Sequence, residues 1–126
     1  PEPVTRKSHL LPDLVHQGVT RGRIRLMTSG AEQRQFLHAD DCADGLIQQR
    51  ECGQPVADLT SGQWVTVASV AAAVARELEC PLTLGERPGY DTLVEPVHRL
   101  AGWQPRIGLP EGIRAVVRVM REQGWV

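Results

Sequence analysis

Two periodicities meet in Gln33-Arg34-Gln35-Phe36-Leu37-His38-Ala39-Asp40-Asp41. The partial alternation of apolar and polar residues over 35–39 predicts a short strand. A helical pattern follows, and Asp40 or Asp41 is expected to cap its first turn, because a carboxylate accepts hydrogen bonds from the free amides there. Gly53 is expected to end this helix. A strand that leads into a helix in this way is typical of an α/β protein.

The alternation of strands and helices continues on both sides of this segment. The other expected elements are, in chain order, a helix at 11–20, a strand at 23–28, a strand at 56–59, a helix at 67–78, a strand at 82–84, a short helix at 97–100 and a last helix from Pro110 to Gly124. The helix at 67–78 has the most regular spacing of apolar residues at i, i+3, i+4 and i+7. Four short strands and several helices need a partner surface that covers them.

The composition favours one globular domain whose positively charged side chains are suited to binding anions. The chain has 126 residues, of which 41% are hydrophobic, and a formal net charge of -1. Lys7 is the only lysine, so the positive charge is carried almost entirely by arginine, whose planar guanidinium grips phosphate or carboxylate in a bidentate way. Without a net positive charge or a basic run, a partner nucleic acid or membrane surface is not expected.

The cysteines and the lack of targeting segments point to a cytoplasmic protein. Cys42, Cys52 and Cys80 are odd in number and form no CxxC pair, which argues against a zinc site and a disulfide framework. No apolar run approaches the roughly 20 residues of a membrane span, and no signal peptide is recognisable. The chain begins at Pro1 and not at a methionine. We therefore also expect it to be a piece of a longer protein.

Three segments together resemble one protein family. They are the segment around Arg34, then Arg87-Pro88-Gly89-Tyr90-Asp91, then Leu100-Ala101-Gly102-Trp103-Gln104-Pro105. Their order and separation resemble the carboxyl-terminal half of the nucleotide-sugar epimerases and dehydratases, the extended short-chain dehydrogenase/reductase family, from about Ser8 onward. The resemblance implies an α/β fold in which residues 1–126 form a small substrate-binding lobe and outer elements of a doubly wound, Rossmann-like sheet. No complete dinucleotide-binding domain is expected in the chain.

The resemblance also implies a site for a nucleotide diphosphate. A buried phosphate needs fixed cationic donors, and the arginines that match the family positions are Arg34 and Arg87. Asp91 is expected to accept from ribose hydroxyls or to orient Arg87. His9 stands where many relatives carry an asparagine that binds the sugar diphosphate at the start of a helix. These residues predict substrate binding and supply no catalytic group.

Two further stretches carry side chains that could bind a ligand. Arg25 and Met27 lie on a stretch that resembles the strand beside the nucleotide base in relatives, although packing is the preferred role of Leu26 and its neighbours. His38-Ala39-Asp40-Asp41 carries side chains that can bind metals, but capping of the following helix explains these acids better. Trp103 is expected to be a packing residue, and no metal site is expected.

The family's reaction centre has no counterpart in the sequence. Hydride chemistry there requires a glycine-rich dinucleotide turn and a Tyr-x-x-x-Lys pair, whose tyrosine acts as acid and base. Tyr90 is the only tyrosine, and Val94 stands four residues after it. NAD or NADP is therefore expected only in a complete enzyme, bound by the missing half, and not by this chain alone.

The sequence thus predicts the nucleotide-diphosphate-sugar binding portion of an NAD(P)-dependent sugar-nucleotide epimerase or dehydratase, inactive on its own. A nucleotide-sugar reductase or decarboxylase built on the same lobe is a neighbouring alternative. The alternative from another class is a non-catalytic interaction or subunit module derived from this family. Because the missing half would leave apolar surface uncovered, its partner would be that half, a separate subunit or a second copy in a homodimer.

Overall fold

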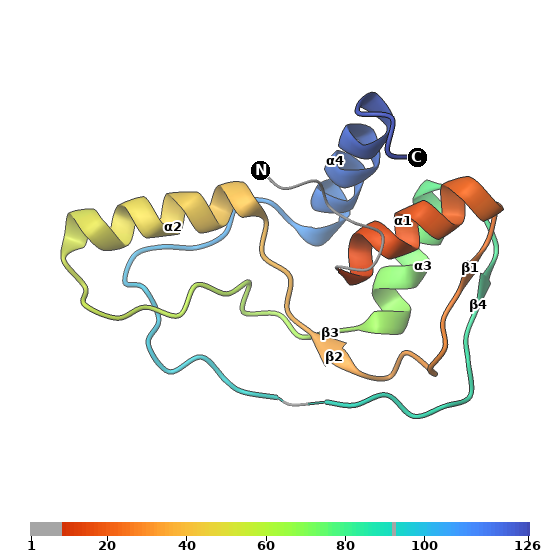
Figure 1. The fold of residues 1–126 in the computed structure, drawn as a ribbon. Helices are drawn as coiled ribbons and strands as arrows, with labels where there is room; N and C mark the ends of the chain where they lie inside the picture. The colour runs from red at the N-terminus through yellow and green to blue at the C-terminus, as the bar shows by residue number, and fades with distance from the viewer. Residues whose placement is uncertain (1–8, 92) are drawn as a thin grey trace.

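The computed structural model describes residues 9–91 and 93–126 (Figure 1). These residues form four helices, α1 (Leu10–Arg21), α2 (Ala39–Cys52), α3 (Val67–Glu77) and α4 (Leu109–Glu122). They also form four strands of two residues, β1 (Ile24–Arg25), β2 (Gln33–Arg34), β3 (Val65–Thr66) and β4 (Leu82–Thr83). Strand β1 pairs with β4 in parallel, and β2 pairs with β3 in antiparallel register. The α/β class predicted from the sequence is confirmed.

The hydrophobic core lies between α1, α3, α4 and the parallel strand pair. Leu14 of α1, Val70 and Val74 of α3, Ile113 of α4 and Ile24 of β1 are fully or almost fully buried. Burial of each such side chain contributes about 1.5–3 kcal/mol relative to exposure. The predicted stripe of α3 therefore becomes the centre of the core, because its apolar face meets both α1 and α4.

Helix α2 stands apart from this core (Figure 1). Among the described residues, the core cluster takes no side chain from α2, and Leu46 and Ile47 on that helix are 56% and 58% exposed. Polar contacts hold α2 to the segment that precedes α4. The Gln48 amide donates to the carbonyl of Ala101 at 3.0 Å. None of the helices in the described residues is long and apolar enough to cross a membrane.

Asp41 is the main polar link between α2 and α4. Its carboxylate is 4% exposed and accepts from the backbone amides of Arg106, at 3.0 Å, and Ile107, at 2.8 Å. The prediction that Asp40 or Asp41 caps α2 is wrong, because His38 holds the cap position and its Nδ1 accepts from the amide of Asp40 at 3.1 Å. Asp41 turns inward instead, toward partners 65 and 66 residues away.

Several helix boundaries follow the sequence closely. Helix α1 is closed by Gly22, the residue after its last turn, which adopts a left-handed conformation with φ 64°, and Gly53 closes α2 in the same way. Thr66 caps α3 by accepting from the amide of Ser69. Helix α4 begins one residue before Pro110, so the proline takes the second helical position and not the first.

Three predicted elements are wrong. The strand expected at 35–39 lies at 33–34, where it pairs with the unexpected strand β3. No strand forms at 56–59, where Asp58 instead holds another segment with its side chain. No helix forms at 97–100, where the amides of Val97 and His98 donate to the Asp58 carboxylate, at 3.0 and 2.9 Å.

These contacts predict how acid acts on the loop. Hydrogen bonds from the backbone amides of His98 and then Val97, with a smaller contribution from His98 charge, hold the pKa of Asp58 below its ordinary value of 3.8. A lowered folded-state pKa means that the stabilisation is complete above the unfolded-state pKa and is lost as the pH falls through the folded-state pKa. Asp58→Asn should therefore be less stable than the parent at pH 7, and the two should converge as the pH falls below 3.8, through the lowered pKa of Asp58.

Urea titrations of both proteins at pH 7 and in acid measure this difference, because other carboxylates titrate equally in the two. A gap between the two midpoints that stays constant from neutral pH into acid would mean that the Asp58 carboxylate does not stabilise the loop.

Candidate functional site

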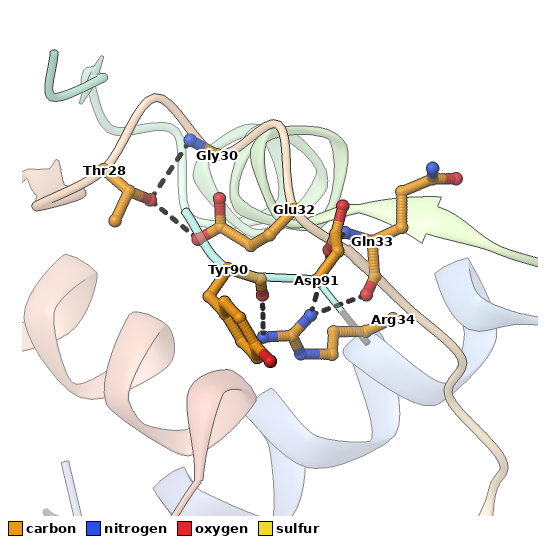
Figure 2. A network of polar contacts seen from close by, with 7 residues as sticks. All are labelled: Thr28, Gly30, Glu32, Gln33, Arg34, Tyr90 and Asp91. Carbon is orange, nitrogen blue, oxygen red and sulfur yellow. Dashed lines mark hydrogen bonds and ion pairs between the residues drawn. The ribbon is translucent and has the colours of Figure 1, made fainter. Parts of the chain in front are cut away.

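Arg34 and Asp91 meet at the end of β2, although they lie 57 residues apart in the chain (Figure 2). Nη1 of Arg34 lies 3.4 Å from Oδ1 of Asp91, and the two side chains are 47% and 35% exposed. Nη1 also donates to the carbonyl of Gln33 at 2.7 Å, and Nη2 donates to the carbonyl of Tyr90 at 3.2 Å. The guanidinium is thus held in place by two backbone carbonyls and one carboxylate.

Asp91 also ties its own turn to the strand. Its Oδ1 accepts from the amide of Gln33 at 2.6 Å, in addition to the contact with Arg34. An ion pair this exposed is worth about 0–1 kcal/mol, so a more highly charged anion can compete with it for the guanidinium. The Nε–H of Arg34 takes no part in these contacts. The site therefore presents an arginine that is fixed in position and still able to bind an anion.

Backbone contacts with the segment at 28–29 hold Arg87 in position. Its carbonyl accepts from the amide of Ser29 at 2.8 Å, and it forms a parallel bridge with Thr28. The side chain is exposed, and among the described residues no ion pair involves its guanidinium. Asp91 pairs with Arg34, so the expected role of Asp91 in orienting Arg87 is not seen. The ribose alternative for Asp91 remains a prediction.

Glu32 supports the turn that carries these residues, and the sequence did not single it out. Its Oε1 accepts from the Thr28 hydroxyl at 2.7 Å, while Oε2 is buried and has no hydrogen-bond partner among the described residues. Gly89 lies against this carboxylate so closely that any side chain there would collide with it. The one sequence feature that could have pointed to Glu32 is its position as an acidic residue two positions before Arg34 and four after Thr28.

The remaining expected ligand-binding residues lie just before α1 and in or just after β1. His9 precedes α1, where its carbonyl accepts from the amide of Asp13 at 3.2 Å and its side chain makes no capping bond. Arg25 and Met27 are exposed while Leu26 between them is buried, so the predicted packing role is confirmed for Leu26 and is wrong for its two neighbours. Within residues 9–91 and 93–126, no hydrogen bond or ion pair links these side chains to Arg34 or Asp91.

Two further features of the described residues concern metal ligands and Trp103. In the described part of the chain, no group of three histidine, cysteine or acidic side chains could hold a metal ion. Trp103 packs against α2, where a Cβ added at Gly45 would lie 3.1 Å from the indole. Its Nε1 is buried and has no acceptor among the described residues.

Comparison with known proteins gives both sequence and structural relatives. The chain is 31% identical over 124 residues to the putative GDP-L-fucose synthase 2 of Oryza sativa subsp. japonica, which aligns with 88% of this chain. It spans 36% of that protein, so it corresponds to about a third of the curated relative's length. No protein-family model matches the chain.

Solved structures share the fold. RMD from Pseudomonas aeruginosa, complexed with NADPH, superposes with a TM-score of 0.77 at 18% identity, over 96% of this chain and 45% of that one. UDP-glucose 4-epimerase from Thermotoga maritima, with UDP-glucose, superposes with a TM-score of 0.72 at 14% identity, over 93% of this chain and 40% of that one. These structural similarities extend over less than half of each known protein.

Proposed function

Because the chain matches a partial, carboxyl-terminal region of the nucleotide-sugar epimerase and dehydratase family, we propose that it binds the nucleotide diphosphate of a sugar nucleotide. In this proposal it is the substrate-binding portion of an NAD(P)-dependent epimerase or dehydratase and is inactive on its own. The supporting observation is the guanidinium of Arg34, which is anchored by the carbonyls of Gln33 and Tyr90 and, among the described residues, is neutralised only by a partly exposed carboxylate.

The chemistry of the site suits a diphosphate. A diphosphate carries more charge than one carboxylate, and its oxygens can accept two parallel N–H bonds from a guanidinium. It would replace the Asp91 carboxylate at Arg34 and take a second contact from Arg87 on the neighbouring turn. Asp91, released from Arg34, would then be available to accept from ribose hydroxyls.

Cofactor chemistry would fall to another part of the enzyme. NAD or NADP would supply reversible oxidation of the sugar when it is bound. The described residues do not fit this cofactor, because neither strand of the parallel pair β1–β4 runs through a glycine-rich turn directly into a helix. This chain would bind the nucleotide, orient the sugar and hold it in place by proximity.

The proposal predicts a specific loss of binding in two arginine variants. Calorimetric titration with GDP and with UDP should show binding to the 126-residue chain, weakened about 10-fold to 100-fold in Arg34→Ala and in Arg87→Ala, because each loses a charged hydrogen bond to phosphate. Arg118→Ala is the matched control. That side chain is 71% exposed on α4, and its one ion pair within the part of the chain that the structure describes is with Glu122, at 3.9 Å.

Two results would reject this function. One is the absence of binding to either nucleotide in the unmodified chain. The other is an equal loss in the Arg118→Ala control, which would mean that the nucleotides respond to overall charge and not to the site.

One observation favours the alternative of an interaction module. Leu46 and Ile47 are more than half exposed on α2, which would suit association with another protein surface or with a second copy. Sedimentation of the purified chain discriminates between the two functions. Self-association without any response to nucleotide would favour the module.

A further inference from the structure

Tyr90 is the most exposed large apolar or aromatic side chain in the part of the chain that the structure describes, at 80%. It is also the chain's only tyrosine. An aromatic ring left in water contributes nothing to the core. Its position beside the proposed diphosphate site suggests a ligand as its partner, since tyrosine is favoured where one side of a ring meets an apolar surface and the hydroxyl stays wet.

The backbone around Tyr90 is fixed although the ring is free. The Tyr90 carbonyl accepts from Nη2 of Arg34 at 3.2 Å, and the next residue, Asp91, accepts from the amide of Gln33. On the other side, Gly89 packs against the Glu32 carboxylate. The turn therefore holds the Cα of Tyr90 next to the guanidinium and leaves only the side-chain torsions adjustable.

The ring projects on the side of the turn where Arg34 lies. Figure 2 shows it directed toward the Arg34 guanidinium and away from the Glu32 carboxylate. A nucleotide presents a charged diphosphate and a flat base that are joined by one ribose. A fixed guanidinium with an exposed aromatic ring beside it matches this combination, because every base has a π face that can stack on an aromatic side chain.

We infer that Tyr90 is the stacking surface for the nucleobase of the bound nucleotide. This inference rests on the proposed function, and it adds the residue that distinguishes a nucleotide from a bare diphosphate. The base is favoured over the hexose as the stacked group because Tyr90 adjoins Asp91, the residue proposed to meet the ribose. Tyr90 therefore lies toward the nucleoside end of the ligand.

The test compares GDP with inorganic pyrophosphate on three forms of the chain. Calorimetric titration of the parent, Tyr90→Phe and Tyr90→Ala gives six affinities. Tyr90→Ala should bind GDP about 10-fold more weakly and bind pyrophosphate as the parent does, because only GDP has a base to stack. Tyr90→Phe should bind GDP like the parent, because it keeps the ring. Because the ring is exposed, both variants should keep the parent's thermal midpoint.

A second readout reports on the stacked group itself. The H8 proton of guanine should shift upfield on binding to the parent and lose this shift with Tyr90→Ala.

The outcomes distinguish a failure of this inference from a failure of the proposed function on which it rests. If the parent binds neither GDP nor pyrophosphate, both fail. If Arg34→Ala weakens both ligands while Tyr90→Ala weakens neither, the diphosphate site stands and the stacking role is wrong. If Tyr90→Ala weakens GDP and pyrophosphate equally, the ring only supports Arg34, which also overturns the stacking role.

Discussion

Asp41→Ala is expected to lower the free energy of unfolding by about 2–5 kcal/mol. The carboxylate is almost fully buried and uses both oxygens, one for the amide of Arg106 and one for the amide of Ile107. Alanine would leave two part-buried amides without an acceptor, and an unsatisfied donor costs about 1–3 kcal/mol when it is fully buried and less when water reaches it. The link that fixes the start of α4 relative to α2 would be lost with them.

Two variants show whether this loss belongs to the hydrogen bonds. Asp41→Asn keeps one acceptor oxygen and should lose about half as much stability as Asp41→Ala. Asp40→Ala removes the neighbouring acid, whose side chain is exposed and lies 3.8 Å from the His38 ring, and should change stability by less than about 0.5 kcal/mol. Urea unfolding followed by circular dichroism measures all three. An unchanged midpoint for Asp41→Ala would refute the structural role of this carboxylate.

Gly30→Ala is expected to cost about 2–4 kcal/mol, as the sum of two separate effects. Gly30 has φ 73°, a left-handed conformation that disfavours a side chain by about 1–2 kcal/mol. A Cβ there would also lie 2.8 Å from the backbone nitrogen of Ala68, which donates to the Gly30 carbonyl at 2.9 Å. The start of α3 would have to move away from the loop that leads to Arg34.

Gly53→Ala is the matched control for this substitution. Gly53 has φ 72°, nearly the same as Gly30, and nothing lies within 4 Å of a Cβ added there. It should show the conformational cost alone, so the difference between the two variants measures the steric contribution. Thermal unfolding of both variants provides the comparison. Equal losses would mean that the close approach of Gly30 to α3 has no energetic consequence.

The elements that the sequence predicted well are those whose pattern matches their own burial. Helix α3 was predictable because Val67, Val70, Ala71, Val74 and Ala75 form a stripe that the core buries. The strands were harder, because each is only two residues long and is defined by its partner more than by its own alternation. The cap of α2 was mispredicted because Asp41 binds amides more than 60 residues away.

The candidate site, like the fold, was predictable only in part. Arg34, Arg87 and Asp91 were proposed from the resemblance of their segments to a family, and composition or periodicity alone would not have grouped them. The structure brings Arg34 and Asp91 into contact, whereas the approach of Gly89 to the Glu32 carboxylate and the position of Tyr90 beside Arg34 depend on how two distant segments meet. Such contacts have no signature in the order of the residues.

The most direct test of the account is a crystal structure of the chain grown with saturating GDP. We expect the diphosphate within hydrogen-bond distance of the guanidinium groups of Arg34 and Arg87, with the Arg34–Asp91 pair opened and Asp91 facing the ribose. A nucleotide bound elsewhere while that ion pair stays closed, or no nucleotide at all, would contradict the proposal that this chain holds the nucleotide portion of a sugar nucleotide.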